Sequence, residues 1–282
     1  MAANIGSTAS IVGNPQNMLI GTASGIPFTR FFALLAPVAV LSSLVLFLTV
    51  WAVYRKVLHP PRVPVTITAR SLTIVAWHGL PVGHRLFWRS LPVLLLIMAG
   101  FFLSTRLGVG VHLVALVGGT AALLASGVRP SEVINAVDWT LLVFFGGLFV
   151  VIGGAQHSGL LEVVLKQVQV QPDPSGIVSV HLVSAVVSQL VSNVPLTMLA
   201  IPLIRPVGGE LLWLSLAAGS TLAGNATLIG AVANIIVVEV AARDGVTLGW
   251  WEFTKIGLVV APITLALSIG VLVLEWHWGL LR

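Results

Sequence analysis

The sequence predicts an all-α polytopic membrane protein, and three observations point to this class. Hydrophobic residues make up 57% of the 282 residues, whereas charged residues make up only 8%. A soluble domain normally carries about 25% charged residues, so a fold surrounded by water could not cover itself with so few. Several uncharged stretches are also as long as the roughly 20 residues that a helix needs to cross a bilayer. Cysteine is absent, which excludes disulfides, thiolate metal sites and cysteine nucleophiles.

Five stretches without Asp, Glu, Lys or Arg each have roughly the length of one membrane-spanning helix. They cover residues 31–53, 90–105, 107–128, 139–161 and 256–274, and the second of them can extend into its flanks. Trp276 and Trp278 follow the last stretch and are typical of a membrane interface. We expect each stretch to be one helix.

The uncharged stretch 174–204 is too long for one plain span. Ser192, Asn193 and Pro195 lie at its centre. Ser and Asn favour turns, and Pro breaks a continuing helix. We therefore expect two half-length helices that meet at this turn and form a re-entrant hairpin over 177–204.

Two further stretches indicate interrupted helices. The stretch 211–238 has small and polar residues at its centre, namely Gly219, Ser220, Thr221, Gly224, Asn225 and Thr227. We expect an interrupted helix over 210–243 and a last helix over 251–276. The opening stretch 4–21 is predicted to be the second half of another interrupted helix, with no helix before its polar loop. Broken backbone at membrane depth is tolerated only where protein buries it or where it lines a cavity.

The basic residues predict the orientation in the membrane. The segment 54–89 contains no acidic residue and carries Arg55, Lys56, Arg62, Arg70, Arg85 and Arg89. Short loops rich in Lys and Arg stay on the cytoplasmic side, so we expect this loop to be cytoplasmic. Its cations are suited to the anionic inner leaflet, and no nucleic-acid role is expected.

The first polar loop recurs late in the chain. Residues 7–20 align with residues 224–237, and the identical pairs are Ala9 with Ala226, Gly13 with Gly230, and Asn17 with Asn234. Downstream, Phe28-Thr29-Arg30 matches Phe253-Thr254-Lys255, and Ala36-Pro37 matches Ala261-Pro262. With the predicted topology the two copies are inverted, which is typical of alternating-access transporters with a site at the repeat interface. Residues 1–53 would then end a first repeat, 54–89 would be the basic cytoplasmic loop, and 90–282 would be the second repeat.

These motifs resemble those of the ion transporter superfamily. Residues 3–9 and 11–17 resemble its first-repeat loop, 137–150 resemble the helix that leads to the second hairpin, and Ser192-Asn193-Val194-Pro195 resembles the tip of that hairpin. The superfamily contains citrate-transporter-like permeases, divalent anion:sodium symporters, arsenite/antimonite permeases and sodium/proton antiporters. The resemblance covers essentially the whole chain. It implies a multi-pass secondary transporter of the inner (plasma) membrane that moves a small anion or oxyanion with Na⁺ or H⁺ and without a cofactor.

The resemblance also implies two sets of site residues. The second cation site would consist of Ser188, Ser192, Asn193 and backbone near Gly224, and the surviving half of the first would be backbone around Gly6 with Ser7. Substrate would lie between the tips and touch Asn4, Thr8, Asn193, Val194, Pro195, Asn225 and Thr227. Beyond Na⁺, no metal site is indicated. Each Ser or Thr could instead make an ordinary interhelical hydrogen bond, and Asn17 and Asn234 could be helix caps or interhelical contacts.

The sequence departs from the superfamily at its start. The superfamily has scaffold helices and a first hairpin before the first-repeat loop, and here nothing precedes Met1. An alternative function is therefore a truncated or split-gene subunit that transports only with a partner supplying the missing N-terminal helices; a homodimer is also open. An enzyme is not expected: the sequence has no P-loop and no HExxH, and Thr22 stands where the rhomboid Gly-x-Ser-Gly motif needs its first glycine. Dicarboxylate, sulfate, arsenite and sodium/proton exchange all stay open, as does import against export.

Overall fold

The structure is a computed structural model, and it describes residues 1–55, 84–127, 129–135, 137, 139–158, 171–243 and 245–281. All regular elements within these ranges are helices. Four of them are long and apolar enough to cross a membrane, namely Phe28–Tyr54, Trp88–Leu107, Pro174–Val191 and Trp250–His277. The predicted class, an all-α polytopic membrane protein, is confirmed. Most of the basic loop 54–89 lies outside the described residues, and its cytoplasmic orientation stays a prediction.

The chain divides into two units, one formed by Met1–Lys56 with Leu148–Arg282 and the other by Val57–Gly147. The second unit contains α4 (His84–Leu107), α5 (Val111–Ser126) and α6 (Pro130–Asn135), and α7 (Trp139–His157) begins in it. Glycines allow α4 and α5 to pack closely, because a Cβ on Gly100 would lie only 2.7 Å from the Cγ1 of Val114. The helix predicted over 107–128 is shorter than expected. Gly108, with φ +65°, precedes it, and Gly127 ends it in the left-handed conformation.

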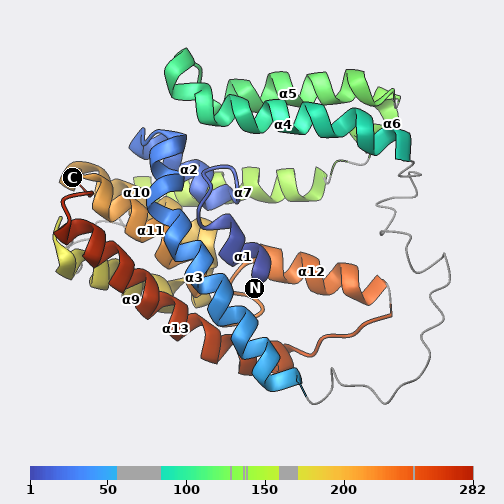
Figure 1. Cartoon of the computed structure of the whole chain (residues 1–282). Helices are drawn as coiled ribbons and strands as arrows, with labels where there is room; N and C mark the ends of the chain where they lie inside the picture. The colour runs from blue at the N-terminus through green and yellow to red at the C-terminus, as the bar shows by residue number, and fades with distance from the viewer. Residues whose placement is uncertain are drawn as a thin grey trace. The chain divides into compact units, whose positions relative to one another are not determined.

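The first unit contains α1 (Ala2–Ser7), α2 (Pro15–Ser24), α3 (Phe28–Tyr54), α9 (Pro174–Val191), α10 (Asn193–Val207), α11 (Glu210–Ala223), α12 (Val232–Arg243) and α13 (Trp250–His277) (Figure 1). Its centre is α11, in which every residue from Leu211 to Ala223 is buried. This helix contacts α9, α13, α10, α2, α3 and α1. Hydroxyl groups inside it bond to the preceding turn, as in the 2.8 Å bond from Ser215 to the carbonyl of Leu211. A helix that is apolar on all sides belongs in the interior, and α11 lies there.

The repeat-related helices α3 and α13 pack side by side and run antiparallel (Figure 1). Arg30, at the start of α3, donates to the carbonyl of Leu280, just beyond the end of α13. Tyr54, at the end of α3, lies 3.5 Å from the carboxylate of Glu252, at the start of α13. Both helices contain the proline of the repeat, at Pro37 and Pro262. The two copies are thus inverted in space as well as repeated in sequence.

The helices break where the sequence predicts turns. Helices α9 and α10 meet at Ser192, whose φ of +70° and ψ of 169° end one helix before the next begins, and we call this pair the hairpin. Helix α9, with 18 residues, is longer than the half-length helix expected and could cross a membrane by itself, so the re-entrant path stays a prediction. Non-helical backbone at 8–14 separates α1 from α2, and 224–231 separates α11 from α12. At the far end of α9, Asp173 caps the helix by accepting from the hydroxyl and backbone N–H of Ser175 and from the N–H of Gly176. These hydrogen bonds, led by that of the Ser175 side chain, hold the pKa of Asp173 below its ordinary value.

Candidate functional site

The first interruption, residues 8–14, is held by one buried amide. Asn17 in α2 is fully buried, and its Nδ2 lies 3.1 Å from the carbonyl of Ser7, 3.3 Å from that of Thr8 and 3.1 Å from that of Ser10. The carbonyls of Ser7 and Ser10 also accept from backbone N–H groups three residues later, whereas the carbonyl of Thr8 is paired through Asn17, and buried carbonyls need partners. Asn17 therefore acts as a brace that keeps this loop in its unwound conformation.

The second interruption, residues 224–231, has the same brace at the equivalent position. Asn234 in α12 donates to the carbonyl of Gly224 at 2.7 Å and to that of Thr227 at 3.1 Å. Gly224 and Thr227 align with Ser7 and Ser10 of the first loop. The repeat is therefore a repeat of geometry, in which one asparagine bonds the same two carbonyls in each copy.

The glycine of each loop is required by close packing. A Cβ on Gly13 would lie 2.6 Å from the carbonyl oxygen of Ser7, and a Cβ on Gly230 would lie 2.9 Å from that of Gly224. Real Cβ atoms do not approach backbone this closely, so each glycine lets its loop fold back on the end of the preceding helix.

Asn4, in α1 just before the first loop, contacts the second loop and its brace Asn234. Its Nδ2 donates to Oδ1 of Asn225 at 3.0 Å and to Oδ1 of Asn234 at 3.1 Å, and all three side chains are buried. The predicted substrate residues Asn4 and Asn225 are thus in direct contact although they lie far apart in the sequence. The contact connects the first repeat to the second.

The tip of the hairpin lies against the second loop. A Cβ on Gly224 would lie 2.6 Å from Nδ2 and 2.9 Å from Oδ1 of Asn193, so the amide of Asn193 covers the backbone of Gly224. Among the described residues, Ser192 is the only non-glycine residue with positive φ. Such strained backbone is often found at ligand-binding sites.

At the junction between the hairpin tip and the second loop, three polar atoms are buried without a hydrogen-bond partner. They are Oγ of Ser192, Oδ1 of Asn193 and Nδ2 of Asn225. Buried polar groups in proteins are nearly always paired, so three unpaired groups at one junction call for an explanation. Two of them are oxygens and the third is an amide donor, so the junction offers partners to a cation and to an anion.

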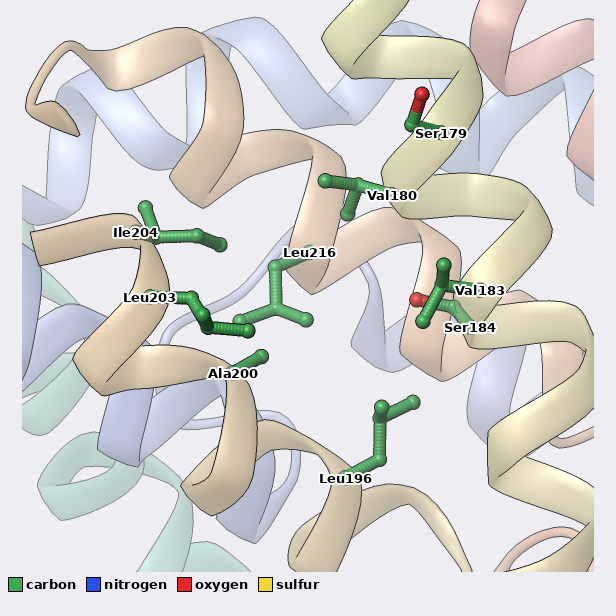
Figure 2. A pocket seen from close by; sticks show the side chains of 9 residues that line it. All are labelled: Ser179, Val180, Val183, Ser184, Leu196, Ala200, Leu203, Ile204 and Leu216. Carbon is green, nitrogen blue, oxygen red and sulfur yellow. The ribbon is translucent and has the colours of Figure 1, made fainter. Parts of the chain in front are cut away.

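A small apolar cavity lies between the hairpin and α11 (Figure 2). Its volume is about 30 Å³ and its lining is Ser179, Val180, Val183, Ser184, Leu196, Ala200, Leu203, Ile204 and Leu216. Only the two serines among these bring hydroxyls. A space of this size and lining suits at most one water molecule and does not fit an anionic substrate.

The structure corrects the prediction for the start of the chain. Gly6 and Ser7 lie within helix α1, so the backbone at Gly6 is helical rather than unwound. A Cβ on Gly6 would meet nothing within 4 Å, so this glycine makes no close approach. The hydroxyls of Ser7 and Thr8 both donate to the carbonyl of Asn4, at 2.8 and 3.1 Å.

The remaining predicted residues belong to the second repeat. Ser188 is fully buried near the end of α9, while Val194 is buried and Pro195 is half-buried in the first turn of α10. The Thr227 hydroxyl donates to Oε1 of Gln189 at 2.8 Å. Asn193, Gly224 and Asn225 form the junction itself.

The sequence analysis missed several polar residues that support these loops. Gln189 contacts the second loop through Thr227, and Asn14, at the end of the first loop, donates to Oγ of Ser7 in α1 at 2.8 Å. Gln16 and Asn14 both lie 3.4 Å from the hydroxyl of Thr221 in α11. One signal could have found Gln189, because a long amide in an uncharged stretch must find a polar partner within the protein.

Comparison with known proteins identifies the family. Residues 1–217 match the model of the citrate transporter family. An uncharacterized transporter of Mycobacterium bovis is 31% identical over 95% of this chain and 64% of its own length. A Dictyostelium discoideum protein named as the transporter arsB is 30% identical over 66% of this chain and 34% of its own length. The P protein of Mus musculus is 31% identical over 63% of this chain and 24% of its own length.

The chain spans 64% of the length of the mycobacterial relative. The matched region contains the first loop, the antiparallel helix α3, the hairpin and most of α11. The chain has the helices of a multi-pass membrane protein, and it belongs to the citrate transporter family.

Proposed function

We propose that this chain forms the binding site of a secondary active transporter that moves a small anion or oxyanion across the membrane together with a coupling cation. The proposal depends on one observation, the unpaired buried atoms of Ser192, Asn193 and Asn225. An unpaired buried polar group costs about 1–3 kcal/mol. A ligand that supplies the missing partners at this junction would remove that cost on binding.

The chemistry of the junction supports a site for two ligands of opposite charge. Oγ of Ser192 and Oδ1 of Asn193 are hard oxygen ligands suited to a cation, and Nδ2 of Asn225 can donate to an anion. The side chains at the junction are neutral. A bound cation would therefore provide the charge that attracts the substrate, and this is a physical basis for coupling.

The same neutrality favours Na⁺ over H⁺ as the ion bound here. Amide and hydroxyl side chains do not titrate in the physiological pH range, so the junction has no group that could take up a proton. For the substrate, the family description makes citrate the first candidate, and the resemblance of the motifs to arsenite permeases adds arsenite. Both belong to the proposed class of small anions and oxyanions.

The proposal is tested by Asn193→Ala and Asn225→Ala in the full-length protein. Each removes one of the unpaired groups, so we expect transport of citrate, succinate, sulfate or arsenite, whichever the unchanged protein carries, to be abolished while membrane insertion stays near normal. Ser42→Ala is the control: Ser42 is buried with an unpaired hydroxyl, but it belongs to the long helix α3 rather than to a loop or the hairpin.

Transport is measured per folded molecule, with Na⁺ and with choline in its place. A purely structural role for the asparagines predicts that transport falls only in step with the amount of folded protein. Wild-type transport and ion dependence in both variants would show that the binding site lies elsewhere.

A further inference from the structure

Gln189 makes three hydrogen bonds, and two of them connect the hairpin to the end of α11 and to the second interruption. Its Nε2 donates to Oγ of Ser188 and to the carbonyl of Ala223, both at 2.8 Å. Its Oε1 accepts from the hydroxyl of Thr227 at 2.8 Å. One amide thus contacts the arm α9, the last residue of α11 and the middle of the loop.

These bonds determine which of the surrounding groups can still donate or accept a hydrogen bond. A threonine hydroxyl has one hydrogen, and that of Thr227 is directed at Gln189, so the oxygen can offer only lone pairs to a ligand. Both N–H groups of the Gln189 amide are used as well. The carbonyl of Ala223, at the end of α11, accepts from the backbone N–H of Ala226 at 3.0 Å, and Gln189 gives it a second hydrogen bond.

The loop is shaped to receive this amide. A Cβ on Gly230 would lie 2.8 Å from Oε1 of Gln189, so the glycine of the second loop also makes room for the glutamine. At Gly13, by contrast, the three nearest atoms all belong to Ser7, at the end of the preceding helix. The second loop is therefore built around a side chain that the hairpin contributes.

We propose that Gln189 is a positioning residue that fixes the second loop to the hairpin arm and holds Thr227 as a hydrogen-bond acceptor, so that Thr227 faces the cation rather than the anion. This inference rests on the proposed function, because it assigns one of the suggested substrate residues to the cation. It also predicts that Gln189 touches neither ligand and acts through Thr227 and the loop.

The first test measures how Na⁺ stabilises the purified full-length protein, with choline chloride keeping the ionic strength constant. Thermal unfolding is followed for Gln189→Met, Thr227→Val, Thr227→Ser and the double variant Gln189→Met/Thr227→Val. We expect the two single variants Gln189→Met and Thr227→Val each to weaken the apparent Na⁺ affinity by about tenfold, the equivalent of one lost ligand contact. Thr227→Ser keeps the hydroxyl and should stay within about threefold of the unchanged protein, since its contact is retained.

The double variant shows whether Gln189 acts through Thr227. If it does, the two losses are not additive and the double variant binds Na⁺ about as weakly as either single variant. Gln16→Met is the matched control, because it makes the same chemical change at a buried glutamine of the first repeat whose contact is longer, at 3.4 Å. Additive losses, or an unchanged Na⁺ affinity in Gln189→Met, would overturn the inference.

The second test does not depend on Na⁺. The chain has no cysteine, so Ala226→Cys places a single thiol in the second loop. Gln189→Met should raise the rate at which a small maleimide labels this thiol by about tenfold, because the loop loses its link to the hairpin and opens more often. Gln16→Met should leave the rate unchanged.

The two tests separate the inference from the proposed function. An unchanged labelling rate in Gln189→Met rejects the positioning role and leaves the transport proposal intact. A raised labelling rate in a protein that Na⁺ does not stabilise supports the positioning role and rejects the cation site. Should Gln189→Met not fold, Gln189→Glu replaces it: the carboxylate still accepts from Thr227, so labelling should rise while Na⁺ affinity does not fall. A fall in Na⁺ affinity in Gln189→Glu contradicts the acceptor role of Thr227.

Discussion

The two interrupted helices share a backbone geometry but are supported in different ways. Asn17 and Asn234 brace equivalent carbonyls, and Gly13 and Gly230 allow the same close approach. The first loop then supports itself locally, because Asn14 caps α2 by accepting from the N–H of Asn17 at 2.8 Å.

The second loop lacks that cap. Its equivalent residue is Ala231, which has no polar side chain, and the loop instead bonds to Gln189 of the hairpin. An unwound loop can therefore be held either by residues of its own sequence or by a distant element. A loop held by the hairpin will respond when the hairpin moves, whereas the first loop keeps its shape.

The largest effect is expected from removing the two braces. Asn17→Ala leaves the carbonyl of Thr8 without a partner and removes the second partner of the Ser7 and Ser10 carbonyls. Asn234→Ala leaves the carbonyl of Gly224 without a partner, removes the second partner of the Thr227 carbonyl and also removes an acceptor of Asn4. Each buried group left unpaired costs about 1–3 kcal/mol, so we expect a clear fall in the thermal unfolding temperature for both variants. The loss should be smaller for Asn234→Ala, because Gln189 still holds the second loop. Ser42→Ala is the control, and equal behaviour of all three variants would contradict the bracing role.

The glycines give the next largest effect, and it should be alike in the two loops. Gly13→Ala and Gly230→Ala each place a Cβ within 3 Å of backbone oxygen, and overpacking of this kind costs about 1–3 kcal/mol. Gly6→Ala is the matched control, since its Cβ meets nothing within 4 Å and alanine favours the helix α1. Thermal unfolding should show a loss for the first two variants and none for the third. A stable Gly13→Ala protein would show that the first loop is less tightly packed than described.

A smaller effect is expected from the cap that distinguishes the loops. Asn14→Ala removes the cap of α2 and should lower stability by about 1 kcal/mol, the usual cost of losing an asparagine N-cap. The reverse change, Ala231→Asn, should not stabilise the second loop. A Cβ on Gly224 would lie 2.9 Å from that of Ala231, so this side of the loop is already close-packed. Stabilisation by Ala231→Asn, measured by thermal unfolding, would show that the two loops are interchangeable after all.

The smallest effect concerns the two ends of the antiparallel pair α3 and α13. At one end Arg30 bonds both carboxylate oxygens of Glu210, at 3.1 and 2.9 Å, with the side chains 37% and 25% exposed. A double-mutant cycle of Arg30→Met and Glu210→Gln should give a coupling of about 1 kcal/mol, the upper range for an exposed ion pair. At the other end, Tyr54→Phe should be silent because the contact with Glu252 is long and exposed. A larger loss from Tyr54→Phe than from the ion pair would reverse this ranking.

Much of the fold was predictable because it depends on local chemistry. The break at Ser192 follows from Ser, Asn and Pro in an otherwise apolar stretch, and the break after Ala223 follows from a run of small and polar residues. The start of the chain was not predictable in the same way. Helix α1 is too short to give a periodic signal, and it is held by tertiary contacts of Ile5 and Asn4, both of which are buried.

The candidate site likewise contains some residues that the local sequence predicts and others that it does not. Asn193 and Asn225 stand out in the sequence because a buried amide within an apolar span needs a partner. Gln189 satisfies the same condition, but its partners Ala223 and Thr227 lie 34 and 38 positions later, and no local pattern connects them. The contact of Asn4 with Asn225 spans 221 positions and depends wholly on the packing of the helices.

The membrane class, the positions of the helix breaks and the presence of two related loops follow from the sequence alone, because hydropathy, turn chemistry and repetition are properties of the residue order. The contacts that each loop makes with the rest of the protein depend on the packed structure. Antiparallel packing of α3 and α13 accompanies the contact of Asn4 with the second loop, and the hairpin supplies Gln189 to one loop alone. These choices depend on which buried polar groups find each other across the bundle. That pairing is settled by the packed fold as a whole, since a donor and acceptor far apart in sequence leave no local trace.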